Sequence, residues 1–205
     1  MYNLIQKLYP ICRSITGNGV RESLNIIRKY ISINIKEISS STNVYDWKVP
    51  DEWNIKDAYI KNSNGDKIID FKKHNLHIVG YSEPINIQLT YNELIKHIHT
   101  LPEHPDWIPY RTSYYKKTWG FCMKHKEFLK LDKNDIYEIY IDSEFTEGNL
   151  TYADLIIPGK VKKEILISCY ICHPSMCNDS ISGVVVATYI AKYLLNKDNY
   201  YTYRF

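Results

Sequence analysis

Between residues 164 and 169 the chain carries a nearly unbroken apolar run of strand length. Such a run suits a strand that is buried on both faces of a parallel or mixed sheet. A polar loop follows over residues 172–180, and residues 181–195 then show a helical pattern with small and β-branched residues on the inner face. Strand, loop and helix are the first parts of a βαβ unit, so the sequence predicts an α/β fold for this region.

The last residues, 201–205, have the pattern of the opening of a further strand. A crossover helix normally returns the chain to a parallel neighbour of the first strand. A neighbour this short would leave the strand at 164–169 with an open apolar edge, which favours aggregation. We therefore expect either that another chain covers this edge, as in a homo-oligomer, or that the sequence belongs to a longer protein.

The first part of the chain has a helical rhythm. Apolar residues recur at helical spacing from Val20 to Ile31, just after a breaker at Gly17-Asn18-Gly19. This spacing predicts an amphipathic helix over residues 20–31. Residues 1–8 predict a second, short helix that packs beside it.

A β-rich pattern begins with the polar loop at residues 39–43. Asn64-Gly65 lies between two strand-like runs and predicts a β-hairpin, and Thr90 with Glu93 predicts a capping box at the start of a short helix. The expected strands are 58–61, 67–71, 76–79, 85–89, 136–141 and 150–157. The predicted domains are therefore an N-terminal helical part at 1–39, an inserted β-rich domain at 40–155 and the start of an α/β core at 156–205.

Charge and hydropathy argue against several classes of partner. The formal net charge is +3 over 205 residues, and the lysines are spread without a block of like charge, which argues against a nucleic-acid-binding arm. The sequence has no run of about 18 consecutive apolar residues that would predict a membrane span, and its start lacks the pattern of a signal peptide. The odd number of cysteines, 5, favours free thiols in a reducing cytoplasm.

The loop after the apolar strand occupies the place where α/β sheets bind ligands, beyond the carboxyl end of a strand. It contains His173 and Asp179, an imidazole and a carboxylate that are both good zinc ligands. A two-metal hydrolase needs a bridging carboxylate, an imidazole on each metal, further carboxylates and usually a glutamate base. The alternatives are structural: His173 as a hydrogen-bonded loop histidine, and Asp179 as the N-cap of the following helix.

A cysteine motif overlaps this loop. Cys169, Cys172 and His173 fit the CxxCH pattern of covalent haem attachment, but that chemistry requires export, so we expect no haem. A redox-active dithiol needs its CxxC at a helix N-terminus, whereas Pro174 and a polar loop follow here. A structural zinc site from Cys169, Cys172 and Cys177 lacks a fourth ligand nearby. The simplest interpretation of Cys169 is a small buried hydrophobic residue.

Aromatic residues are dense between residues 108 and 122, and tyrosine is common throughout, at 19 of 205 residues. Their simplest role is to pack a small sheet. A groove of such residues would alternatively stack on sugars or peptides, with contributions from the tryptophans Trp47, Trp53, Trp107 and Trp119. The β-rich segment thus leaves a second function open, a non-catalytic module that binds a glycan or a peptide.

Several stretches, in order along the chain, carry a family resemblance. They are residues 13–20 (RSITGNGV), 44–53 (VYDWKVPDEW), 108–115 (IPYRTSYY), 119–122 (WGFC), 172–175 (CHPS), 178–179 (ND), 182–183 (SG) and 201–205 (YTYRF). In these stretches the sequence resembles a bacterial family that has an aminopeptidase-like domain and is often found beside polysaccharide-biosynthesis genes.

The resemblance implies a zinc-exopeptidase-like α/β fold, of the phosphorylase/hydrolase-like kind, with a mostly-β domain inserted near the N-terminus. It implies that His173 binds one of two zinc ions and that Asp179 bridges both. Family members run on for roughly as long again, and their later part would carry the other metal ligands and the catalytic glutamate, so the C-terminal part of the fold is missing here. We therefore expect the N-terminal portion of a metal-dependent hydrolase that acts on a peptide, a related amide or a modified sugar and is inactive as an isolated chain.

Overall fold

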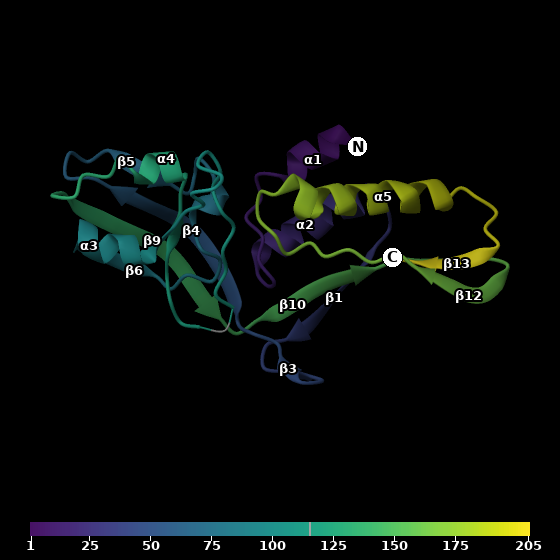
Figure 1. Cartoon of the computed structure of the whole chain (residues 1–205). Helices are drawn as coiled ribbons and strands as arrows, with labels where there is room; N and C mark the ends of the chain where they lie inside the picture. Colours follow the sequence, from purple (N-terminus) through teal and green to yellow (C-terminus); the bar gives the residue numbers. More distant parts are fainter. Residues whose placement is uncertain (115) are drawn as a thin grey trace. The chain divides into compact units, whose positions relative to one another are not determined.

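The computed structural model describes residues 1–114 and 116–205 of the chain. These residues form two compact units: unit 1 contains residues 1–52 and 147–205, and unit 2 contains residues 53–146. In unit 1, β1 (Asn34–Ser39) runs antiparallel to β10 (Asn149–Asp154), and the two lie side by side in Figure 1. This pair brings together the two stretches of chain that precede and follow unit 2, and unit 2 lies within the predicted β-rich segment 40–155.

Two helices begin unit 1, where the apolar spacing predicted them. They are α1 (Tyr2–Leu8) and α2 (Asn18–Arg28). Their buried residues are Leu4, Leu8, Val20, Ser23, Leu24 and Ile27. Gly17 precedes α2 with φ +97°, a left-handed conformation that glycine adopts without a Cβ clash. The predicted amphipathic helix is confirmed, although it ends at Arg28 rather than at residue 31.

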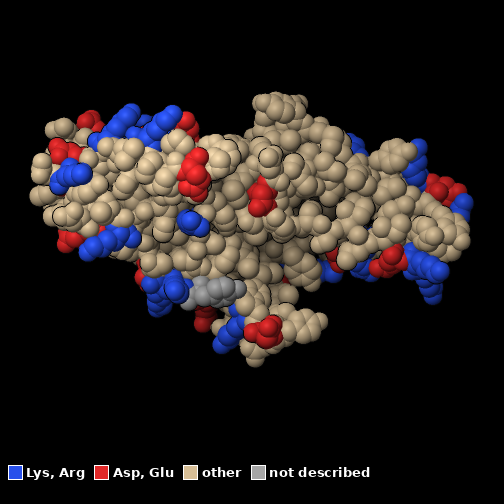
Figure 2. Space-filling model, viewed as in Figure 1, with Lys and Arg blue, Asp and Glu red and all other residues tan. Residues whose placement is uncertain are grey.

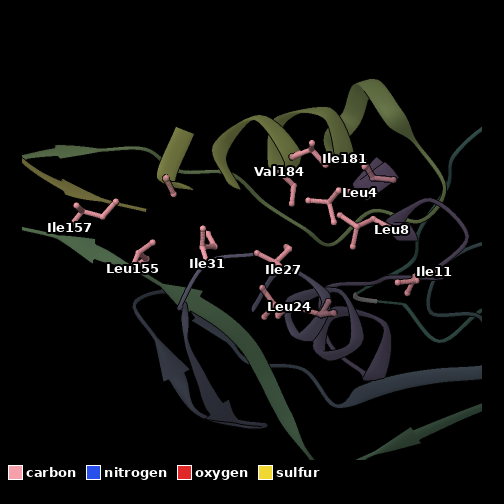
Figure 3. Packing of buried hydrophobic residues seen from close by; sticks show 13 residues of the cluster. Leu4, Leu8, Ile11, Leu24, Ile27, Ile31, Leu155, Ile157, Ile181 and Val184 are labelled. Carbon is pink, nitrogen blue, oxygen red and sulfur yellow. The ribbon is translucent and has the colours of Figure 1, made fainter. Parts of the chain in front are cut away.

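The core of unit 1 lies between these helices and α5 (Ser182–Leu194), the long helix near the C-terminus. Figure 3 shows Leu4 of α1 close to Ile181 and Val184, and Ile27 of α2 pointing into the same cluster. Burying side chains of this size stabilises the fold by about 1.5–3 kcal/mol each. The cluster therefore holds the first turn of α5, and the loop that leads into it, against the N-terminal helices.

A three-stranded sheet completes unit 1, in the order β11 (Ile156–Ile157), β13 (Tyr201–Arg204) and β12 (Val161–Leu166). β12 and β13 are parallel and are joined through α5, which confirms the predicted βαβ unit. The predicted burial of the first strand is wrong, because β12 is mostly exposed and its last residue, Leu166, is 67% exposed. The physical reason is its position, since β12 is an edge strand of the sheet that this chain forms.

Unit 2 is built on a four-stranded sheet in the order β5 (Lys67–Asp70), β4 (Glu52–Lys61), β9 (Ile136–Thr146) and β6 (Ile85–Thr90), labelled in Figure 1. β4 and β5 form the hairpin predicted at Asn64-Gly65, where Gly65 has φ +84°. β6 pairs antiparallel with β9 along its whole length. The strands that the sequence predicted for this sheet are thereby confirmed.

The strand predicted at 76–79 is wrong. Asn75–His77 forms a short 3-10 helix, η1, and Ile78 makes only an isolated bridge. The ring of His74 accepts a hydrogen bond from the backbone N–H of Leu76, at 3.2 Å. This local bond starts a turn where the apolar pattern alone favoured a strand.

The shorter elements follow local signals. The capping box is confirmed, because Thr90 and Glu93 bond reciprocally at the start of α3 (Tyr91–Leu94). The remaining elements are β2 (Asn43–Val44) and β3 (Trp47–Lys48) in unit 1, and η2 (Ile95–His97), β7 (Ile98–His99), β8 (Phe121–Cys122) and α4 (His125–Phe128) in unit 2. The strand predicted at 150–157 is divided into β10 and β11.

The surface agrees with the scattered charge of the sequence. On the face drawn in Figure 2, lysine and arginine atoms lie interspersed with those of aspartate and glutamate among a larger area of other residues. Within residues 1–114 and 116–205, no helix combines the length and the apolar character that crossing a membrane requires.

Candidate functional site

His173 and Asp179 lie in the connection between β12 and α5, beyond the carboxyl end of a parallel strand. A short turn, η3 (Cys177–Ile181), leads directly into α5. Asp179 departs from helical geometry within this turn, with φ −129° and ψ 89°. The carboxylate is therefore presented by irregular backbone, as in many ligand-binding loops.

Tyr170 brings the two predicted ligands together. Its hydroxyl donates a hydrogen bond to Oδ1 of Asp179, and its ring centroid lies 5.1 Å from that of His173. The backbone carbonyl of Tyr170 in turn accepts a hydrogen bond from the Ser180 hydroxyl at 2.9 Å. His173 and Asp179 therefore gather around a single tyrosine within this loop. Sequence reasoning missed Tyr170, because its role depends on how the loop folds back on itself.

The surroundings of His173 favour the neutral form of its imidazole ring. Its pKa lies below the ordinary value, chiefly because partial burial disfavours the charged form. The carboxylate of Asp179 acts in the opposite direction on that pKa, and the Arg13 guanidinium adds to the lowering. Since a metal binds the neutral form of the ring, this environment is compatible with a ligand role.

The N-cap interpretation of Asp179 is wrong. The N-cap position of α5 belongs to Ile181, and no side-chain capping bond is made there. The Asp179 carboxylate accepts its hydrogen bond from Tyr170 instead. The acidic side chain thus serves an interaction within the loop rather than the helix terminus.

The cysteines do not build a second site. Cys169 is exposed, so its interpretation as a buried hydrophobic residue is wrong. The reason is that β12 ends at Leu166, which leaves Cys169 in the loop rather than in the sheet. Cys172 is partly buried, and its Sγ lies 3.6 Å from Nδ1 of His173.

The donors present fit part of a metal site. Among the residues that the structure describes, no group of at least three histidine, cysteine, aspartate or glutamate side chains is close enough to hold a metal ion. Zinc sites use three or four protein ligands. His173 and Asp179 are the right donor types for zinc, but they would need further ligands to complete its coordination.

The aromatic residues of unit 2 mostly pack against one another. Trp53 and Tyr81 are each 3% exposed, and their rings stack at 5.7 Å. Trp119 stacks on His97 at a centroid distance of 3.7 Å. Trp107 and Phe145 are more exposed, at 60% and 40%. This burial favours a packing role over a continuous aromatic groove. Tyr115, at the end of the matching stretch 108–115, lies outside the described residues.

Comparison with known sequences identifies relatives along the whole chain. Residues 2–205 match the family described as Domain of unknown function (DUF4910). A Clostridium acetobutylicum protein, named for polysaccharide biosynthesis and an aminopeptidase-like domain, is 53% identical over 205 residues. The match covers 100% of this chain and 47% of that protein, so the chain spans about half the length of this relative.

Solved structures also include relatives that cover 99–100% of this chain. A crystal structure from Clostridium acetobutylicum, named for a peptidase, has a TM-score of 0.97 at 53% identity and covers 100% of this chain and 48% of its own. A peptidase M28 precursor from Shewanella amazonensis has a TM-score of 0.59 at 12% identity, covering 99% of this chain and 62% of its own. The zinc aminopeptidase BSAP from Bacillus subtilis has a TM-score of 0.55 at 13% identity, covering 99% and 59%.

The last two likenesses are distant and establish the fold alone. They show that this chain has the mixed α/β architecture found in these two proteins and covers 62% and 59% of their chains. The expected fold class is thereby confirmed. With a family match over residues 2–205, this chain belongs to the family described as Domain of unknown function (DUF4910).

Proposed function

We propose that this chain is the N-terminal portion of a metal-dependent, aminopeptidase-like hydrolase that cleaves an amide in a peptide or in a modified sugar. The observation that carries the proposal is the gathering of His173 and Asp179 around Tyr170 at the carboxyl end of β12. The distant zinc aminopeptidases of the same fold support it. An imidazole and a carboxylate at such a position are the donors that a zinc hydrolase uses.

Each residue has a proposed role. The His173 imidazole would bind one zinc ion, and the Asp179 carboxylate would bridge two. When bound, such metals polarise the scissile carbonyl and lower the pKa of a water molecule that attacks it. The Tyr170 hydroxyl orients the Asp179 carboxylate through its hydrogen bond. The other ligands and the general-base glutamate would come from the part of the longer relatives that this chain does not span.

The test is metal analysis of the full-length protein that contains this chain. We expect zinc to co-purify with the wild type, and we expect His173→Ala and Asp179→Asn to lose most of it. His104→Ala is a matched control, because it removes an imidazole that stacks on Trp107 in unit 2. Release of an N-terminal amino acid from short peptides should fall in parallel with the zinc content. Zinc absent from the wild type, or retained in both site variants, would refute the proposal.

We further propose a cytoplasmic location and a link to polysaccharide biosynthesis. All the cysteines of the chain are free thiols, which suits a reducing compartment.

The link to polysaccharides rests on the name of the 53% identical relative. Assays should therefore compare simple peptides with amide-bearing sugars, and cleavage of the sugar amide alone would make it the substrate class.

A further inference from the structure

The Arg13 guanidinium joins the end of α1 and α2, which are near it in the sequence, to the distant loop that carries His173. Its Nη1 donates to the Leu8 carbonyl at 2.6 Å and to the Ser23 hydroxyl at 3.3 Å, in the helical N-terminal part. Its Nε donates to the carbonyl of His173 at 2.8 Å, and its Nη2 donates to that of Pro174 at 3.2 Å. The side chain thus ties the backbone of the loop that carries His173 to the end of α1 and to α2.

Arg13 is buried although removing its charge from water is unfavourable, and filling the space would not require a charged side chain. It is 3% exposed, and burial lowers its pKa to about 10. A buried guanidinium destabilises a fold unless its donors are satisfied. Here each of the three nitrogens donates to a backbone carbonyl, and Nη1 also donates to a hydroxyl. An apolar side chain would fill the same space without the desolvation penalty, so the fork of donors indicates a positioning role.

Further contacts near Arg13 hold the loop against the end of α1 and hold α2 against the segment that carries Arg13. Ser175, which is 5% exposed, donates from its hydroxyl to the Tyr9 carbonyl at 2.6 Å and so ties the next residues of the loop to the end of α1. On the other side, a Cβ at Gly19 would lie 2.0 Å from the Cys12 carbonyl oxygen. Only glycine therefore allows the first turn of α2 to pack against the segment that carries Arg13.

We propose that Arg13 is a positioning residue for the candidate metal site, and that it holds the His173 and Pro174 carbonyls so that the imidazole stays beside Tyr170 and Asp179. The role of Arg13 at a metal site rests on the proposed function, whereas its hydrogen bonds to the loop do not depend on it. Two successive carbonyls are bound by two different nitrogens of one planar group. A lysine ammonium is a single point donor and does not reproduce this fork.

The experiment compares Arg13→Lys and Arg13→Met with Arg21→Met in the full-length protein. Arg21 is the matched control, since it bonds Glu37 and Glu52 rather than the loop. Hydrogen–deuterium exchange of peptides covering residues 170–181 reports the loop, and competition with a chelator reports zinc affinity. We expect both Arg13 variants to exchange faster in this loop and to lose about 10- to 100-fold in zinc affinity. Arg21→Met removes the partner of Glu52 and so controls for general destabilisation of unit 1; it should give no increase in exchange confined to residues 170–181 and no loss of zinc affinity.

The outcomes separate the two proposals. Should the wild type bind no zinc, the proposed function fails, but loop exchange still tests the role of Arg13. Should Arg13→Met fail to fold, Arg13→Lys decides, because it keeps a cation and much of the side-chain volume. Wild-type loop exchange in Arg13→Lys, or faster exchange spread evenly over unit 1, would overturn the proposal and leave Arg13 as a folding residue.

Discussion

Glu52 connects three segments of unit 1, and its neutralisation is expected to destabilise the fold. Its side chain is 9% exposed. It accepts hydrogen bonds from both terminal nitrogens of Arg21, one of them at 2.8 Å, and from the backbone N–H of Asn149 at 2.6 Å. Glu52→Gln keeps the shape of the side chain but removes the charge that these donors share. The substitution therefore isolates the ionic part of the junction between α2 and the start of β10.

The expected loss in the free energy of unfolding depends on which contacts Arg21 keeps after Glu52→Gln. Breaking a buried ion pair from one side costs about 3–5 kcal/mol. Arg21 is 26% exposed and keeps a bond from Nε to Glu37 at 2.7 Å, so part of its charge stays compensated. We therefore expect Glu52→Gln to lower the free energy of unfolding by about 2 kcal/mol near neutral pH.

The pH dependence gives a second measurement. The hydrogen bonds from Arg21 hold the pKa of Glu52 below its ordinary value in the folded state. The stabilisation is thus fully present above the unfolded pKa of about 4.3 and is lost as the pH falls through the lower folded pKa. Wild type and Glu52→Gln should differ most near neutral pH and converge in acid.

The assay is urea unfolding followed by far-ultraviolet circular dichroism at several pH values. Glu144→Gln is the control, because the Glu144 side chain is 49% exposed and lies 3.8 Å from Lys56. It should change stability by less than about 0.5 kcal/mol. A Glu52→Gln effect as small as that of the control, or one that stays constant into acid, would refute this account of the junction.

Four further substitutions test the packing. Gly19→Ala should destabilise unit 1 and lower the melting temperature, because its Cβ would lie 2.0 Å from the Cys12 carbonyl oxygen; an unchanged melting temperature would contradict the close approach. Leu4→Ala should cost about 2–5 kcal/mol in urea unfolding, since Leu4 is 0% exposed. Trp53→Ala should cost about 3–5 kcal/mol and Trp107→Ala less than about 1 kcal/mol, since they are 3% and 60% exposed; equal losses would contradict the packing of unit 2.

Signals between residues close in sequence predicted much of the local structure. The spacing of Val20, Leu24 and Ile27 specified α2, and Asn64-Gly65 specified a hairpin. The reciprocal bonds of a capping box likewise need only residues three apart, and they are present at α3. These predictions succeeded because the interactions that decide them lie within one turn or one hairpin.

Burial could not be predicted in the same way. The apolar residues of β12 indicated a strand buried on both faces, yet Leu166 is 67% exposed, because β12 lies at an edge of its sheet. Cys169 is exposed because the strand ends at Leu166 and leaves it in the loop. The number of neighbours that a strand acquires depends on segments far away in the chain, and an apolar pattern does not record them.

For the candidate site, the pattern of residues predicted the donor types and their place after a parallel strand, because His173 and Asp179 follow an apolar run and precede a helix. What surrounds these two side chains depends on how the whole chain folds. Tyr170 meets both side chains through the fold of the loop, and Arg13 reaches the His173 carbonyl across 160 residues of sequence. Strand and helix patterns arise from neighbouring residues, whereas the orientation of a metal-binding side chain depends on hydrogen bonds that exist only once distant segments have packed together.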